Sequence, residues 1–367
     1  MEQVRDRGAY RLIGGAGEDA RARGLVSANW YRCAVPRPAM KALMQRRDAD
    51  AIRDTLLWYG LILAAALLFC LSFGSAWAIP AFLLYATLYA GPADSRWHEA
   101  GHGTAFRTRW MNDLLYQVAS FQAMRRPSVW RWSHTRHHTD TLVTGRDPEI
   151  QAQLPIRPLV MLTEFLGFRH VAAESRKMLM NAAGRISEDE KSFIPEMEHG
   201  KVIAEARVWT AIYAAAIAAA LYFGSWLPVL LIGLPSAIGA WLYNFYGLTQ
   251  HAALPENVLD HRLNCRTVMM STLSRFLYWN MNYHVEHHMF PMVPYHALPR
   301  LHEAIKADCP PPYASCWAAY REILPALRRQ WRDPGYFVRR PLPGGPPGLD
   351  QPGAAALSAA PAAGAAE

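Results

Sequence analysis

The sequence predicts an all-α integral membrane protein with four transmembrane helices, arranged as two hairpins, and a helical cap on the cytosolic side. The main observation is charge segregation. Two long apolar runs contain no charged residue and no histidine, so all 38 Lys and Arg and all 14 His lie outside them. We divide the chain into a flexible N-terminus at 1–35, a membrane domain at 36–340 and a disordered Pro/Gly/Ala tail at 341–367.

The first apolar run extends from about residue 56 to residue 91 and reads LLWYGLILAAALLFCLSFGSAWAIPAFLLYATLYAG. A helix needs ~20 apolar residues to cross a bilayer, and this run has roughly twice that length. It is interrupted near its middle by FGSAW at 73–77. Gly and Ser end helices and Trp favours the membrane interface, so we expect two crossings joined by a short turn.

The second apolar run, from 208 to about 247, repeats this design. It reads VWTAIYAAAIAAALYFGSWLPVLLIGLPSAIGAWLYNFYG and is divided by FGSW at 223–226. The alternative for both runs is a buried helical hairpin in a soluble protein. Uncharged runs of this length fit a bilayer better, and we therefore expect four crossings in total.

The distribution of Lys and Arg predicts the orientation. Both hairpin turns are short and uncharged, so the positive-inside rule places the N-terminus, residues 92–207 and everything after 248 in the cytoplasm. We expect a bacterial inner-membrane protein with its active site on the cytoplasmic face. The net charge of +8 suits a surface that faces anionic lipid and an acidic partner. No nucleic-acid-binding motif is present.

The cysteines and the first residues indicate the compartment. The five cysteines are far apart and form no C-x-x-C, so neither a disulfide framework nor a structural zinc site is indicated. This usage suits a reducing compartment. The N-terminal MEQVRDRGAYRLIGG lacks an apolar core and is not expected to be a secretory signal.

Histidines are concentrated in three short boxes. HEAGH at 98–102 follows the first apolar run, and its i,i+4 spacing puts two imidazoles on one helix face. HTRHH at 134–138 and HVEHH at 284–288 share the spacing H-x-x-H-H, and one more histidine follows the second run in GLTQHAALPEN. The nine candidate metal ligands are His98, His102, His134, His137, His138, His251, His284, His287 and His288.

Nine imidazoles are too many for one metal ion and suit two ions with four or five ligands each. With positions left open for O2, this ligand set points to non-haem iron. HEAGH also matches the H-E-x-x-H of zinc peptidases, in which Glu99 would be the general base. That alternative needs only one further ligand and leaves the other boxes unused. The histidines expected to be ordinary surface or core residues are His170, His199, His261, His296 and His302.

Polar residues near the boxes are candidates for orienting the ligands, and we expect no catalytic residue beyond the ligands themselves. Carboxylates beside the boxes could accept the imidazole N–H, which fixes the tautomer and the basicity of the ring. These carboxylates are Glu99, Asp140, Asp147 and Glu286. Two amides, Asn244 and Asn282, are candidates for holding a metal-bound water.

With these boxes around two apolar hairpins, the chain resembles the membrane fatty-acid desaturase and hydroxylase superfamily over roughly residues 40–310. TGRDPE at 144–149 and NYHVEHHMFP at 282–291 also resemble desaturase segments. GLTQHAALPEN and MVPYHALP look most like the hydrocarbon oxygenase branch, which includes the rhizopine-catabolism type. The resemblance implies an integral membrane enzyme in which eight or nine histidines hold two non-haem irons on the cytosolic face.

The resemblance further implies an O2-dependent oxidation of an unactivated C–H bond in a lipid-like or hydrocarbon substrate, by desaturation or hydroxylation. O2 is then the co-substrate. The sequence shows no H-P-G-G haem motif, no Cys cluster and no G-x-G-x-x-G after a strand. We therefore expect a separate electron donor, a ferredoxin or Rieske-type ferredoxin with its reductase. A non-catalytic receptor or transporter of the same fold is the alternative that predicts no redox turnover.

Overall fold

The computed structural model describes residues 7–343 and is helical throughout, with no β-strand in that range. Most of the tail predicted from residue 341 lies outside the described residues. In chain order the helices are α1 (Gly15–Ala22), α2 (Arg37–Leu43), α3 (Asp48–Ser72), α4 (Ala78–Gly101), α5 (Arg109–Gln122), α6 (Pro127–Thr139), α7 (Pro158–Phe165), α8 (Phe168–Ala182), α9 (Glu188–Lys191), α10 (His199–Phe223), α11 (Leu227–Ile232), α12 (Leu234–Ile238), α13 (Ala240–His251), α14 (His261–Asn264), α15 (Thr272–Leu277), α16 (His284–Met289), α17 (Leu298–Ile305) and α18 (Cys316–Arg332).

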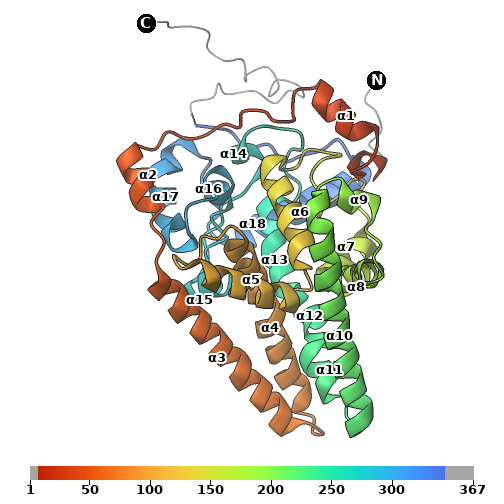
Figure 1. Cartoon of the computed structure of the whole chain (residues 1–367). Coiled ribbons are helices and arrows are strands. Elements are labelled where there is room, and N and C mark those ends of the chain that lie inside the picture. Colours follow the sequence, from red (N-terminus) through yellow and green to blue (C-terminus); the bar gives the residue numbers. More distant parts are fainter. Residues whose placement is uncertain (1–6, 344–367) are drawn as a thin grey trace, which may run out of the picture.

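The molecule has a stem and a cap. The stem consists of α3, α10, α11, α12 and the first part of α4, which extend together from one end of the body (Figure 1). The remaining helices form the cap at the other end, and α13 continues the returning arm into it. Apolar side chains cover the outside of the stem, and Leu71, Ile79 and Leu221 are between 67% and 78% exposed. Among the described residues, two helical segments, Arg37–Ser72 and Glu196–Phe223, are long and apolar enough to cross a membrane.

The first predicted hairpin is present as α3 and α4, joined at residues 73–77 with Gly74 at a φ of 88°. Helix α4 does not stop where the apolar run ends but continues to Gly101. Its charged turn enters the cap, where Asp94 pairs with Arg125 at 2.6 Å and the Arg96 guanidinium donates to the Phe276 carbonyl at 2.8 Å. This continuation carries the first histidine box into the interior of the cap.

The second hairpin departs from the expectation of two continuous arms. Helix α10 ends at Phe223, where Gly224 adopts a left-handed conformation with a φ of 59°, but the returning arm is divided into α11, α12 and α13. The breaks fall at Gly233 and Gly239. A Cβ added at Gly239 would lie 1.8 Å from the Ala86 carbonyl oxygen of α4. The arm therefore bends where glycine lets it pack directly against α4.

The N-terminal segment, expected to be loosely ordered, is packed against the cap over residues 7–35. Tyr10 is buried, and its hydroxyl donates to the Glu256 carboxylate at 2.7 Å. Ala20 and Leu25 form a small apolar cluster with Val143. Buried apolar side chains thus hold a segment whose Gly and Arg content suggested a lack of order. From α1 it runs along the end of the cap farthest from the stem, as far as α2 (Figure 1).

Candidate metal centre

Four helices deliver the nine predicted histidines to one buried place in the cap. The carboxyl-terminal ends of α4 and α13 bring His98, His102 and His251, while α6 and α16 bring the two H-x-x-H-H boxes. The two H-x-x-H-H boxes lie on helices, so in each of them the first and last histidines share one face and the middle histidine points to the side. Each box consequently supplies both of the groups described below.

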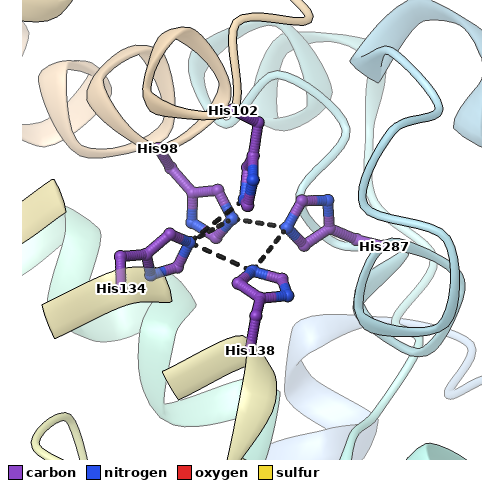
Figure 2. A group of neighbouring side chains, drawn as sticks. All are labelled: His98, His102, His134, His138 and His287. Atoms are coloured by element: carbon purple, nitrogen blue, oxygen red, sulfur yellow. Dashed lines mark hydrogen bonds between the residues drawn. The ribbon is translucent and has the colours of Figure 1, made fainter. Parts of the chain in front are cut away.

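The first group contains five histidines, His98, His102, His134, His138 and His287. Their rings point toward a common centre (Figure 2). The Nε2 atoms of His98 and His287 are 2.6 Å apart, and His138 Nε2 lies 3.2 Å from that of His287. His134 Nε2 lies 3.2 Å from the Nε2 atoms of both His98 and His102.

The second group contains four histidines, His137, His251, His284 and His288. His284 Nε2 lies 2.9 Å from His251 Nε2 and 3.0 Å from His288 Nε2. The His137 ring is next to both His251 and His288, at centroid distances of 5.2 and 4.9 Å. The groups are adjacent, because the His138 ring of the first stacks on the His288 ring of the second at 4.3 Å.

The spacing and the protonation of these rings fit bound metal ions. Two imidazole nitrogens bonded to one metal at about 2.1 Å and at right angles lie about 3.0 Å apart, close to the distances within both groups. Burial lowers the pKa of His102, His138 and His287 well below its ordinary value, and the neighbouring imidazoles lower it further. Neutral imidazole is the form that binds a metal, so these three rings are in the ligating state. For His137, burial opposes protonation, but the adjacent Asp147 carboxylate outweighs it and raises the pKa.

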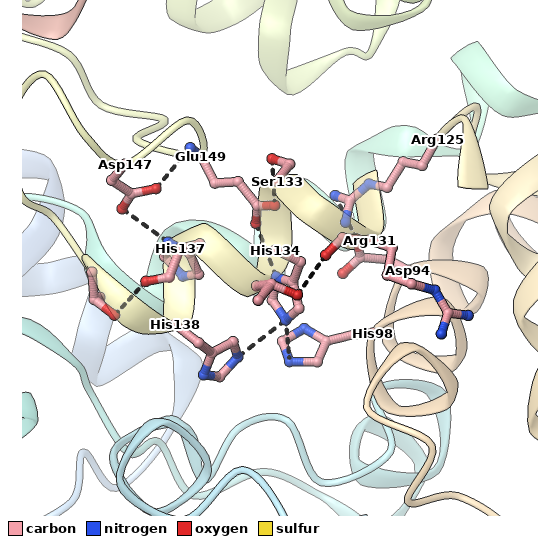
Figure 3. A network of polar contacts seen from close by, with 12 residues as sticks. Asp94, His98, Arg125, Arg131, Ser133, His134, His137, His138, Asp147 and Glu149 are labelled. Atoms are coloured by element: carbon pink, nitrogen blue, oxygen red, sulfur yellow. Dashed lines mark hydrogen bonds and ion pairs between the residues drawn. The ribbon is translucent and has the colours of Figure 1, made fainter. Parts of the chain in front are cut away.

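The outer nitrogens of several rings are held by acceptors in the surrounding helices and loops. His137 Nδ1 lies 2.9 Å from Asp147 and His134 Nδ1 lies 3.1 Å from Glu149 (Figure 3). His251 Nδ1 lies 2.8 Å from the Asn264 carbonyl. A proton held at Nδ1 leaves the Nε2 lone pair free to point at a metal, and it also fixes the orientation of the ring.

Comparison with known proteins agrees with this geometry. Residues 75–320, more than half of the chain, match the family model for fatty acid desaturases. The chain belongs to the fatty acid desaturase family. It is 27% identical to Delta(8)-fatty-acid desaturase 2 of Arabidopsis thaliana over 294 residues, which cover 70% of this chain and 63% of that protein. It is 24% identical to human fatty acid desaturase 3 over 239 residues, 58% of this chain and 51% of that protein. The chain thus spans between half and two thirds of these relatives.

Membership of the desaturase family favours the oxidoreductase over the zinc-peptidase alternative. The Glu99 carboxylate is fully buried and accepts the backbone N–H of Tyr295 at 3.0 Å. None of the nine histidines is a hydrogen-bonding partner of Glu99 in the described residues. Through Tyr295, Glu99 supports the connection between α16 and α17.

Of the residues predicted to orient the ligands, Asp147 contacts a candidate ligand and the others form different bonds. Asp140 pairs with Arg146 at 3.0 Å, and Glu286 bonds Thr267 and His302. Asn244 donates to the carbonyls of Glu164 and Phe165, and Asn282 donates to that of Val268. These four side chains form hydrogen bonds or ion pairs with the loops and helices around the centre, because their nearest donors and acceptors lie there.

Glu149 is the residue that sequence reasoning missed. Burial alone would raise the pKa of Glu149, but the adjacent His134 lowers it to about 2, so the carboxylate stays charged beside its imidazole. Ser133 donates to the same carboxylate at 2.9 Å. The signal was present in TGRDPE, because Glu149 follows Asp147 by two residues and its backbone N–H bonds Asp147 at 2.8 Å.

Replacing Glu149 by glutamine should weaken iron retention about 10- to 100-fold, because the neutral amide accepts the His134 N–H less well and the ring loses its fixed orientation. Iron content after dialysis against a chelator measures this. Glu188→Gln is the matched control, since Glu188 pairs only with exposed Lys191. Wild-type iron retention in Glu149→Gln would show that Glu149 does not support a ligand.

Proposed function

We propose that this chain is a membrane oxidoreductase that holds two non-haem irons in its five- and four-histidine groups and oxidises an unactivated C–H bond with O2. The observation that carries this proposal is the convergence of nine imidazoles, six of them buried and three half-buried, in two adjacent groups, each with its ligand atoms within 4.8 Å of one another. One O2, two electrons and two protons then yield either a double bond and two waters, or a hydroxyl group and one water.

The protein contributes geometry and exclusion of water. Two ferrous ions, when bound, would supply the redox chemistry with O2 that acid–base residues cannot perform on an alkyl C–H bond. His134 and His137, held by Glu149 and Asp147, keep their Nε2 lone pairs directed inward. Six of the nine histidines are buried, which limits water on the inner side of both groups and protects the reaction from side reactions.

The substrate class that fits best is a lipid-like or hydrocarbon chain. Two relatives carry the names of fatty-acid desaturases. A small cavity of about 50 Å³ adjoins His137 and His251, and its lining combines the apolar side chains of Leu248 and Leu254 with polar ones such as Gln250. We place the hydrocarbon oxygenase branch within this proposal as one substrate choice, and both desaturation and hydroxylation as outcomes of the same site.

Metal and product analysis test the function together. We expect the purified protein to bind close to two non-haem irons per chain, and to consume O2 with an acyl or alkyl substrate once electrons are supplied. Mass spectrometry should then find a product that has lost two hydrogens or gained one oxygen. A protein with one tightly held zinc and hydrolytic activity on a peptide would contradict the proposal, as would iron binding without any O2-dependent product.

We also propose four membrane crossings, α3, α4, α10 and the broken arm α11–α13, with the cap on the cytoplasmic side of a bacterial inner membrane. The apolar exterior of the stem and the lack of Lys and Arg at its turns support this. A reporter fused after Glu367 should respond as cytoplasmic. Reporters inserted at Ser75 or Ser225 should respond as external, and an external C-terminal reporter would reverse the topology.

The electrons are proposed to come from a ferredoxin or Rieske-type ferredoxin with its reductase. The five cysteines are free thiols spread over the described residues, with no group that could bind an iron–sulfur cluster. The net charge of +8 favours an acidic protein as the donor. Such a donor would dock on the side of the cap that faces away from the stem.

A further inference from the structure

A hollow in the cap leads from the surface to the five-histidine group. It has a volume of about 370 Å³, and its inner wall includes the candidate ligands His102 and His138. Part of its rim comes from the strap, which we define as residues 24–36 between α1 and α2, through Trp30 and Arg32. A molecule bound at this rim would lie across the hollow from two candidate ligands, His102 and His138.

The same rim also connects to the four-histidine group through stacked aromatic rings. The Trp30 indole lies on the His261 ring at a centroid distance of 4.3 Å and an angle of 3°, and its N–H donates to the Thr139 carbonyl at 3.1 Å. The His261 ring is in turn 5.2 Å from that of His288, a candidate ligand. His261, which the sequence suggested was an ordinary core histidine, thus lies between the surface and the metal centre.

The position of the strap favours a water-soluble visitor over the substrate. The strap crosses the end of the cap opposite the stem, whereas a lipid-like substrate would arrive from the stem side (Figure 1). The rim of the hollow carries exposed polar side chains, those of Ser27, Arg32 and Thr139, beside the apolar surface of Trp30. These features fit a protein that approaches from the aqueous phase.

The charge at the rim identifies the kind of protein. Arg32 is exposed, and no carboxylate in the described part of the chain forms an ion pair with it. Arg131 lies one helical turn before Thr135, which also lines the hollow; its guanidinium covers the Tyr116 ring at 4.3 Å and likewise has no ion-pair partner there. The Arg32 guanidinium on the rim, with that of Arg131 one helical turn from the lining residue Thr135, attracts an acidic partner.

We infer that the Trp30–Arg32 rim is the docking surface for an acidic one-electron carrier of the ferredoxin class, and that electrons enter there. This inference rests on the proposed function. Two reduced carriers dock in succession, and each gives up one electron and leaves oxidised. The two electrons reach the centre through the Trp30–His261 stack to His288. They are the two that one turnover with O2 consumes.

The test measures binding and reduction separately, on the full chain in lipid nanodiscs with a plant-type [2Fe–2S] ferredoxin. Arg32→Glu should weaken binding of oxidised ferredoxin about fivefold or more at low salt, since it replaces an attraction with a repulsion. Arg328→Glu on α18 is the matched control, because Arg328 is exposed and the change of charge is identical. It should bind ferredoxin like the wild type.

Variants of Trp30 test the route. Trp30→Phe keeps a ring over His261 and should accept electrons from reduced ferredoxin at close to the wild-type rate, whereas Trp30→Ala should be slower severalfold. Dithionite, a small reductant that needs no docking surface, should reduce all variants equally. Unchanged ferredoxin binding in Arg32→Glu, or equal weakening in Arg328→Glu, would overturn the docking surface. Equal ferredoxin-driven rates in Trp30→Ala and the wild type would overturn the route.

The outcomes also separate this inference from the proposed function. A wild-type protein that holds no iron and takes no electrons from dithionite would contradict the function and leave nothing for the rim to serve. The inference alone would be contradicted if the wild type is reduced by dithionite and turns over, while the Trp30 and Arg32 variants turn over with ferredoxin at the wild-type rate.

Discussion

Replacing His137 or His287 by alanine should abolish turnover and lower bound iron from about two ions per chain to about one. His287 belongs to the five-histidine group and His137 to the four-histidine group, so each substitution opens one site and leaves the other intact. Loss of residues that merely support a ligand costs about 10- to 100-fold, so loss of a ligand should exceed this. Iron quantification and product formation by the same preparations measure both effects.

The protein should remain folded and inserted in both variants, because the stem helices satisfy their backbone hydrogen bonds internally and bury their apolar surface in lipid. His199→Ala is the control, since His199 begins α10 and lies outside both groups. His302 is less suitable, because it bonds Glu286 between candidate ligands on α16. Equal loss of iron from all three variants, or none from His137→Ala and His287→Ala, would contradict the assignment.

The turns of the stem could be predicted from sequence because they depend on local chemistry. Gly74 and Gly224 take positive φ values of 88° and 59° inside the predicted FGSAW and FGSW segments. The breaks at Gly233 and Gly239 could not be predicted in this way. They depend on the approach of Gly239 to the Ala86 carbonyl, a contact between segments about 150 residues apart.

The candidate site shows the same division between local and distant information. The boxes singled out eight histidines and the end of the second apolar run a ninth, His251, and the structure brings all nine together. The partition into five and four does not follow the boxes. His134 and His138 of α6 join the first group while His137 joins the second, and α16 divides in the opposite sense. This crossing depends on how α6 and α16 face each other, which a single sequence does not reveal.

The orienting carboxylates were predictable only in part, for a related reason. Proximity in sequence suggested Asp140, Asp147 and Glu286, but of these three only Asp147 reaches the imidazole of a candidate ligand. Asp140 directly follows the α6 helix, and its carboxylate accepts a hydrogen bond from the Arg146 guanidinium. Glu149 is farther from the box, yet the turn after α6 folds back and places it beside His134. Closeness in sequence to the histidine box therefore does not predict which carboxylate contacts an imidazole. The conformation of the turn after α6 determines which carboxylate lies next to the helix.

We expect turnover to depend on a separate electron carrier. The purified chain with NADPH, O2 and substrate should form no product, because the described residues contain no cysteine cluster or other redox group besides the proposed irons. Adding a ferredoxin and its reductase should start O2 uptake and product formation. Oxygen electrode traces with and without the carrier give the comparison, and boiled carrier serves as the control.

The same experiment has a salt dependence that follows from the charge of the cap. A basic surface attracts an acidic carrier over about one Debye length, which is ~10 Å at 0.1 M salt and ~3 Å at 1 M. The second-order rate at low carrier concentration should therefore fall as salt rises, while the maximal rate at saturating carrier changes little. Turnover with NADPH and no carrier would reveal a nucleotide site and refute the proposed electron supply. Carrier-dependent turnover that is indifferent to salt would refute electrostatic docking, because the Arg32 and Arg131 guanidinium groups would then contribute nothing to the encounter.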